Sequence, residues 1–239
     1  MIVGGTVSDG SAPELTEVVA LGKTNSTPSF GQLPETIWGA VGTMFGNVPI
    51  ICGGTYFDFY NPDVPIDSNQ CISFQNSQWV PSHGMIEHRS SLAGVQINLL
   101  GNIPAFWLLG GISAEIVLDS TEIIFQGDTN RYSGPNLPYK MFGMCAIKLS
   151  DDEIFVIGGG DEDYNDRNEV WIYNPQNDFA RKQGPSLNIA RQGHSCSTMR
   201  DGEKTFIVVV DGFRGSGSAD SVEIYDPTDK TWHFGKYNS

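Results

Sequence analysis

The chain has 239 residues, of which 39% are hydrophobic and 11% aromatic, a composition typical of a folded globular protein. Its formal net charge is −14, with 14 Lys and Arg against 28 Asp and Glu, which excludes nucleic acid as a partner because phosphate backbones are bound by clustered Lys and Arg. The charge also disfavours an anionic membrane surface. No apolar run reaches the roughly 18 residues of a membrane span, so we expect no membrane insertion.

A short apolar run that ends in a glycine pair recurs along the chain. The pairs are Gly4-Gly5, Gly53-Gly54, Gly110-Gly111 and Gly158-Gly159, and the fifth copy is Asp211-Gly212. A spacing of about 50 residues between copies indicates a repeat architecture. Glycine accepts positive φ and leaves room for a neighbouring backbone, so we expect a strand to bend at each pair.

Two further markers follow the glycine pairs. The first is an acidic or amide residue that opens an alternating apolar stretch, at Glu17, Gln70, Glu122, Glu169 and Glu223. The second is a pair of aromatic residues on either side of a turn-rich segment, as in Tyr225 and Trp232. Alternation predicts strands with one buried face, and each aromatic pair predicts two antiparallel strands joined by a tight turn.

This three-part pattern resembles the kelch repeat, and the resemblance covers essentially the whole chain. It implies an all-β, kelch-type β-propeller of about five four-stranded blades, the first lacking its inner strand. We expect a single domain over 1–239, with blades near 1–33, 34–82, 83–135, 136–185 and 186–239. Kelch propellers usually have six or seven blades, so we expect this chain to be a fragment whose true N-terminus lies upstream of Met1.

The resemblance also implies a partner-binding face, formed by the loops between second and third strands and between blades. Alignment of the blade-to-blade connections places Trp38, Arg89, Phe142 and Arg191 at corresponding positions. The two arginines resemble those with which kelch relatives capture acidic peptides, so we predict a guanidinium fork for carboxylate or phosphate. The alternative is that these four side chains line the mouth of the central channel.

The loops between second and third strands add further candidates. Four aromatic residues in blade two are predicted to contact a partner: Tyr56, Phe57, Phe59 and Tyr60. Arg214 supplies a cation in the corresponding loop of blade five. The acidic loop 161–166 lacks the glycine and the distal glutamate of a calcium-binding loop, so we interpret it as solvated and expect neither metal nor cofactor.

Cysteine placement bears on the cellular compartment. Cys52 and Cys71 fall on neighbouring antiparallel strands and are predicted to form a disulfide, whereas a bridge between Cys145 and Cys196 is conceivable from their equivalent positions in adjacent blades. Asn25-Ser26-Thr27 is a predicted glycosylation acceptor. These signals favour a secreted or extracellular protein over a cytoplasmic one, although four free thiols remain the alternative.

Little in the sequence points to catalysis. The histidines are His83, His88, His194 and His233, and none lies in a zinc-protease or nucleophile-elbow motif. We therefore expect a non-catalytic scaffold that binds a protein, a peptide or another ligand through its loop-bearing face. One alternative is an intracellular adaptor resembling the BTB-kelch substrate receptors of ubiquitin ligases, and a further one is a kelch-family oxidase or sugar-acid mutarotase.

Overall fold

The structure is a computed structural model, and it describes residues 2–3, 16–17, 33–34, 37–58 and 61–235. Four of its sheets have four antiparallel strands each, and we number them blades 2 to 5. Blade 2 consists of β3 (Val41–Phe45), β4 (Val48–Cys52), β7 (Gln70–Gln75) and β8 (Gln78–Gly84). Blade 3 consists of β9 (Ala93–Leu99), β10 (Ile103–Leu109), β13 (Thr121–Phe125) and β14 (Tyr132–Ser133).

The other two complete blades follow in chain order. Blade 4 consists of β15 (Cys145–Ser150), β16 (Glu153–Gly160), β17 (Asp166–Asn174) and β18 (Ala180–Gln183). Blade 5 consists of β19 (Ser195–Asp201), β20 (Lys204–Val210), β23 (Val222–Asp226) and β24 (Thr231–Phe234). Of the first predicted blade the structure describes the paired strands β1 (Ile2–Val3) and β2 (Thr16–Glu17) and the buried Leu33, and the rest lies outside the described residues.

Short hairpins project from the connections between second and third strands. They are β5–β6 (Thr55–Asp58 with Asn61–Asp67), β11–β12 (Ile112–Ser113 with Ile116–Val117) and β21–β22 (Phe213–Arg214 with Gly217–Ser218). In blade 4, β16 and β17 themselves extend into the corresponding turn. The described residues include one short 3₁₀ helix, η1 (Pro175–Asn177), and no helix long and apolar enough to cross a membrane.

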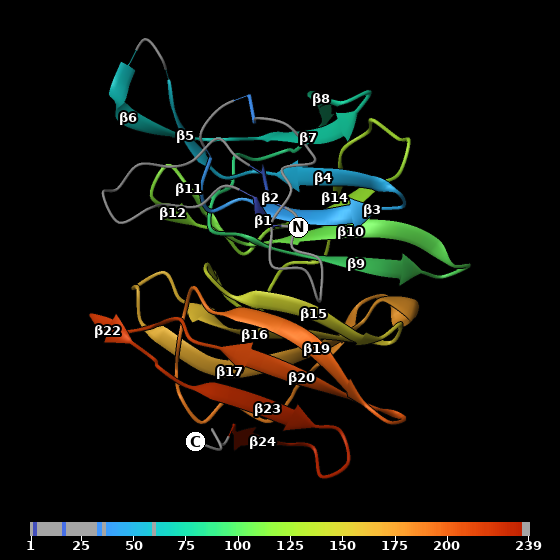
Figure 1. Cartoon of the computed structure of the whole chain (residues 1–239), viewed down its shortest axis with the longest axis vertical. Coiled ribbons are helices and arrows are strands. Elements are labelled where there is room, and N and C mark those ends of the chain that lie inside the picture. The colour runs from blue at the N-terminus through green and yellow to red at the C-terminus, as the bar shows by residue number, and fades with distance from the viewer. Residues whose placement is uncertain (1, 4–15, 18–32, 35–36, 59–60, 236–239) are drawn as a thin grey trace.

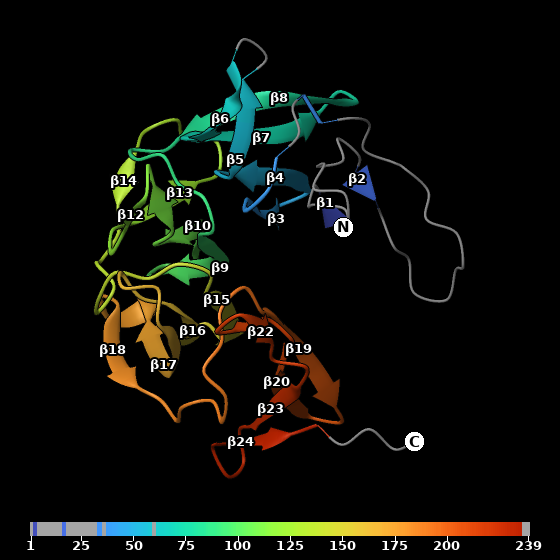
Figure 2. The same cartoon turned by 90° about the vertical axis from the view of Figure 1, so that its left-hand side faces the viewer.

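The four blades are arranged radially. Figure 2 shows the inner strands β3, β9, β15 and β19 facing the centre of an arc, with β8, β14, β18 and β24 at its periphery. The three short hairpins project to the same side, the left in Figure 1. The predicted all-β architecture of four-stranded propeller blades is thereby confirmed.

The glycine pairs form the joints between blades. Gly110 and Gly111 have φ of 53° and 96°, and the amide of Gly111 donates to the carbonyl of Met141 at the start of the next blade (2.8 Å). A Cβ on Gly111 would lie 2.6 Å from the carbonyl oxygen of Ser90, closer than real side chains approach. The fifth copy keeps the bend, since Asp211 has φ of 57°. The predicted bends are confirmed at the four pairs that the structure describes, where they let neighbouring backbones meet, and Gly4-Gly5 lies outside the described residues.

A chain of backbone hydrogen bonds also links the blades beside their inner strands. Ser91 donates to Gly39 (2.8 Å), Gly143 to Ser91 (2.8 Å) and Gly193 to Gly143 (2.7 Å). Each of these residues stands just before the inner strand of its blade, so blades 2 to 5 are tied to one another at equivalent positions. This pairing satisfies backbone groups that the sheets leave open.

Apolar side chains fill the space between adjacent blades. Trp107 of β10 is fully buried and packs against Tyr173 and Phe179 of blade 4, with ring centroids 5.1 and 4.8 Å apart. The marker pair Tyr225 and Trp232 lies directly opposite on β23 and β24, with ring centroids 5.4 Å apart. The predicted antiparallel pairing of these two strands is confirmed, and its aromatic residues form part of the core between blades 4 and 5.

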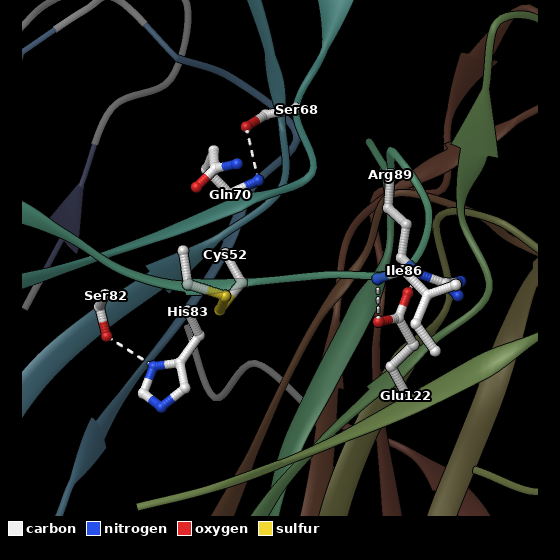
Figure 3. Close-up of a disulfide and its surroundings, with 9 residues drawn as sticks. Cys52, Ser68, Gln70, Ser82, His83, Ile86, Arg89 and Glu122 are labelled. Carbon is white, nitrogen blue, oxygen red and sulfur yellow. Dashed lines mark hydrogen bonds and ion pairs between the residues drawn. A yellow bond between two sulfur atoms is a disulfide. The ribbon is translucent and has the colours of Figure 1, made fainter. Parts of the chain in front are cut away.

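Two disulfides reinforce the fold. Cys52 and Cys71 are directly opposite on β4 and β7, and both are fully buried (Figure 3). Cys145 and Cys196 join the inner strands β15 and β19 of neighbouring blades, with their Cα atoms 6.1 Å apart. The first disulfide therefore lies within one blade, and the second fastens two blades together.

Candidate partner-binding face

We define the hairpin face as the side of the propeller that carries the hairpins β5–β6, β11–β12 and β21–β22, the turn 161–165, and the connections that precede each inner strand. The turns between first and second strands, such as 100–102, lie on the opposite face. The partner-binding residues predicted from the sequence that the structure describes belong to this hairpin face or lie directly beneath it.

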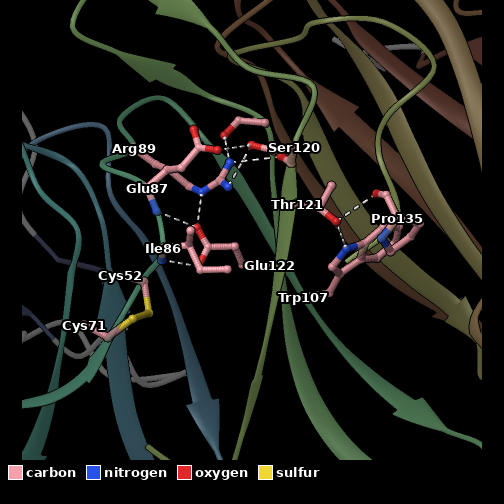
Figure 4. Close-up of polar contacts among 11 residues, drawn as sticks. Cys52, Cys71, Ile86, Glu87, Arg89, Trp107, Ser120, Thr121, Glu122 and Pro135 are labelled. Carbon is pink, nitrogen blue, oxygen red and sulfur yellow. Dashed lines mark hydrogen bonds and ion pairs between the residues drawn. A yellow bond between two sulfur atoms is a disulfide. The ribbon is translucent and has the colours of Figure 1, made fainter. Parts of the chain in front are cut away.

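Arg89 lies beneath the hairpin face and is fully buried. Its guanidinium donates to a carboxylate oxygen of Glu122 (2.9 Å), to the carbonyls of Gly110 (2.9 Å) and Ser120 (3.0 Å), and to the Ser120 hydroxyl (3.0 Å). Figure 4 shows Arg89 beside Glu122 and Ser120. All these partners belong to blade 3. Arg89 therefore holds the start of its own blade together.

Arg191 has the same environment in blade 5. It is fully buried and donates to Glu223 (2.8 Å), to the carbonyl of Asp211 (2.8 Å) and to the carbonyl and hydroxyl of Ser221 (3.2 and 2.7 Å). The prediction of a guanidinium fork that captures a partner is wrong for both arginines. Their donors are directed into the protein, and no part of either side chain reaches solvent.

The buried glutamates also fasten the connections between blades. Glu122 accepts from the amides of Ile86 (2.6 Å) and Glu87 (3.1 Å), and Glu223 accepts from those of Asn188 (2.7 Å) and Ile189 (3.1 Å). Each carboxylate thus binds a guanidinium and two backbone amides, which offsets the cost of burying its charge. In blades 3 and 5 the acidic residue of the sequence pattern has this structural role.

The predicted alignment of the connections is wrong by one residue. Isolated β-bridges pair Trp38 with Thr55, Ser90 with Ile112, Phe142 with Gly160 and Gln192 with Phe213. Trp38 and Phe142 therefore correspond to Ser90 and Gln192, which follow the two arginines. The positions equivalent to the arginines are Ile37 in blade 2 and Met141 in blade 4.

Blade 4 departs from its neighbours at this position. By strand register Trp171 corresponds to Glu122 and Glu223, and Met141 corresponds to the two arginines, so this blade has neither member of the ion pair. Glu169 corresponds to Ser120 and Ser221. Its Oε2 is buried without a hydrogen-bond partner among the described residues, and its Oε1 lies 3.7 Å from Arg167. The predicted repeat marker at Glu169 is therefore two residues out of register with Glu122 and Glu223.

Tyr139 and Asp161 complete the surroundings of this glutamate. Arg167 lies over the ring of Tyr139 at 5.4 Å and pairs with Asp161 at 2.9 Å. Burial, and secondarily the charge of Glu169, raise the pKa of Tyr139 to about 12, so its hydroxyl remains a donor. Burial raises the pKa of Asp161, but hydrogen bonds from Asn165 and the other donors outweigh it, and the net pKa is lowered.

Large apolar side chains are exposed on each hairpin of the face. The exposed fractions are 45% for Phe57, 61% for Ile116, 56% for Tyr164 and 62% for Phe213. Phe57 packs against Trp38 with ring centroids 5.0 Å apart, and Tyr164 against Phe142 at 5.3 Å. Sequence reasoning missed Ile116, Tyr164 and Phe213, although Phe213 directly precedes the predicted Arg214.

Carboxylates hold neighbouring hairpins to one another. Asp67 at the end of β6 accepts from the hydroxyl of Thr55 and from the amide of Ala114 in the next blade, both at 2.9 Å. Asp166 similarly accepts from Gln192 (2.9 Å) and from the amide of Gly215 in blade 5 (2.6 Å). These contacts between blades 2 and 3 and between blades 4 and 5 limit the freedom of the hairpins.

The remaining predicted residues are distributed as follows. Tyr56 is half-buried and lines a cavity of about 270 Å³ with Gln70 and Trp79, and Arg214 is exposed on β21. Phe59, Tyr60 and Asn25 lie outside the described residues. Across the part of the chain that the structure describes, no three His, Cys, Asp or Glu side chains are grouped so that they could hold a metal ion.

Comparison with known proteins supports the architecture. No protein-family model matches the chain. Over 100 residues, or 40% of this chain, the sequence is 32% identical to Kelch-like protein 25 of Xenopus tropicalis, and the matched stretch is 16% of that protein. The solved structure of YjhT superposes with a TM-score of 0.74 at 12% identity, covering 98% of this chain and 80% of YjhT.

These findings define the class of protein. At 12% identity the likeness to YjhT shows the fold alone, and with the four-stranded blades it confirms the predicted kelch-type β-propeller fold. The chain spans less than a fifth of Kelch-like protein 25, so that protein's name bears on this chain only as support for a proposal.

Proposed function

We propose that this protein is a non-catalytic interaction scaffold that binds a protein partner on its hairpin face. The observation that carries the proposal is the exposure of Phe57, Ile116, Tyr164 and Phe213, one on each hairpin or turn of that face. Aromatic and apolar side chains that are exposed before binding and buried afterwards provide most of the free energy of protein interfaces.

The rigidity of the face supports the same proposal. The two carboxylate contacts from Asp67 and Asp166 hold hairpins of neighbouring blades in fixed relative positions. A face that is ordered before binding loses less conformational entropy when the partner docks. The similarity to a kelch-like protein over part of the chain is consistent with such a scaffold.

We also propose an oxidising, extracellular environment for the protein. The support is the presence of two disulfides, one within blade 2 and one between blades 4 and 5. An intracellular adaptor would keep four free thiols. Intact mass after alkylation without reductant separates the two, because native protein with both disulfides takes up no alkyl groups.

The binding proposal is tested by comparing variants of the two faces. The double variant Y164A/F213A removes two exposed rings from the hairpin face, and L100A, at a side chain 75% exposed on the opposite face, is the matched control. We expect wild type and L100A to recover a partner protein from culture medium, and we expect Y164A/F213A not to recover it. Equal recovery by all three proteins would overturn the proposal.

A further inference from the structure

Each junction between successive blades from blade 2 to blade 5 contains the same set of backbone hydrogen bonds. The connection that leads into a blade makes them through three residues, one at a first position and the others four and six residues later. These residues are Met85, Arg89 and Ser91 for blade 3, Leu137, Met141 and Gly143 for blade 4, and Leu187, Arg191 and Gly193 for blade 5. Their partners all belong to the preceding blade.

The set consists of three amides and one carbonyl of the connection. From donor to acceptor, the four bonds between blades 4 and 5 join Leu187 to Asn168 (2.8 Å), Arg191 to Arg167 (3.0 Å), Gly159 to Arg191 (2.8 Å) and Gly193 to Gly143 (2.7 Å). The corresponding bonds at the two earlier junctions are 2.7 to 3.0 Å long. A blade therefore docks on its neighbour through backbone groups at a fixed spacing.

Blade 5, at one end of the arc in Figure 2, carries the same four receiving groups. The Ala219 amide donates to the Gly212 carbonyl (2.9 Å) as the Leu118 amide donates to the Gly111 carbonyl (2.9 Å), which fixes the correspondence between blades. Within the described part of the chain these groups make no hydrogen bond: the amide of Gly212 and the carbonyls of Gly193, Ala219 and Asp220.

The sheet face of blade 5 that points away from blade 4 has the composition of an interface between blades. Its apolar residues include Val208, Val210, Val222 and Ile224. The residues in the same register in blade 4 are Phe155, Ile157, Val170 and Ile172. All four residues of blade 4 are buried against blade 5, whereas Val210 is 41% exposed and the other three of blade 5 are partly exposed. A sheet with such a face is stabilised by a second layer that covers it.

A hollow of about 330 Å³ lies on this face between Val210, Asp220 and Val222. Leu187 is buried in the junction between blades 4 and 5, with its amide bonded to Asn168, which is the counterpart of Asp220. The first residue of a further connection would fill the hollow in the same way.

The fold comparison indicates how large the covering element is. Since the matched 80% of YjhT equals 98% of 239 residues, the unmatched fifth of YjhT is about 60 residues long, close to one kelch repeat. The fold that superposes on this chain therefore has room for about one more blade.

We propose that one further four-stranded blade of the same polypeptide, encoded outside residues 1–239, docks on this face of blade 5. Its connection begins with an apolar residue, and it supplies amides at that position and four and six residues later, so none of the three is proline. The last has positive φ, as do Ser91 (50°), Gly143 (58°) and Gly193 (62°), which favours glycine. The blade adds a hairpin beside β21–β22 and extends the hairpin face beyond Phe213.

The test compares the 239-residue chain with the longest polypeptide of the same transcript, each carrying V210C or L100C. The four native cysteines are in disulfides, so a maleimide labels the introduced thiol alone. Val210 lies on the free face of blade 5, and Leu100, 75% exposed on the opposite face of the propeller, is the matched control.

We expect the longest polypeptide to contain one more repeat with the stated connection, and V210C to be labelled at least about tenfold more slowly in it than in the 239-residue chain, with L100C unchanged. Equal labelling of V210C in the two chains would overturn the inference, as would a longest polypeptide without a further repeat. Protection of V210C in the 239-residue chain that grows with protein concentration would also overturn it, since a second copy would then cover the face.

Discussion

The buried pair of Arg89 and Glu122 gives a quantitative prediction about stability. In R89M, Glu122 keeps the amides of Ile86 and Glu87 but loses the guanidinium, and the carbonyls of Gly110 and Ser120 lose a donor. Removing one member of a buried ion pair costs about 3–5 kcal/mol, because the remaining charge is left uncompensated. For a domain of this size that corresponds to a fall in Tm of about 6–20 °C.

The assay is urea denaturation followed by tryptophan fluorescence with the disulfides intact, on R89M, E122Q and the double variant R89M/E122Q. We expect the double variant to be less destabilised than the sum of the two singles by about 1–3 kcal/mol, since it leaves no buried charge. R200M, at an exposed arginine of β19, is the control and should change stability by less than about 0.5 kcal/mol. Wild-type stability for R89M would refute the structural role of the pair.

Three further predictions follow from single features. Burial, and then the charge of Arg191, lower the pKa of His194 to about 4. Between pH 6.5 and 4 only the unfolded state binds a proton at this histidine, so the free energy of unfolding should fall by about 3 kcal/mol as the pH drops through that window. In urea titrations at different pH, H194L should show a flatter dependence of stability on pH. G111A should destabilise the protein far more than G101A, because both glycines have positive φ but only a Cβ at Gly111 would meet other atoms within 4 Å; equal Tm values would contradict this. The half-exposed disulfide Cys145–Cys196 should be reduced by dithiothreitol before the fully buried Cys52–Cys71, and mass spectrometry of alkylated peptides would show the order. Reduction of Cys52–Cys71 first would contradict this. The double variant C145S/C196S should lower the free energy of unfolding by about 4 kcal/mol, because the disulfide closes a loop of 51 residues.

The repeat itself could be predicted from the sequence because its markers have local causes. A glycine pair such as Gly110-Gly111 is required wherever two neighbouring backbones meet at positive φ, and that requirement is visible in one sequence. The pairing of Tyr225 with Trp232 across a tight turn is similarly local. Cys52 and Cys71 were placed on neighbouring strands by the same markers.

The site was harder to predict because it depends on register and on orientation. The predicted alignment matched Trp38 and Phe142 with the two arginines, whereas they correspond to the residue after each arginine. No residue spacing in the blade-to-blade connections reveals this shift of one residue. The joint presence of Arg89 with Glu122, and of Arg191 with Glu223, was a signal for buried pairs, since blade 4 has neither charge and carries Met141 and Trp171 at these positions. The exposure of Ile116, Tyr164 and Phe213 depends on how each hairpin projects, which the sequence pattern does not encode.

The most direct test of the central claim is hydrogen–deuterium exchange of the chain with and without a partner recovered by wild type and L100A. Binding through the hairpin face predicts slower exchange in the partner complex at 112–117, 161–168 and 213–218, with no change in the turn 100–102 of the opposite face. Protection confined to 100–102 and the other turns of the opposite face would contradict it.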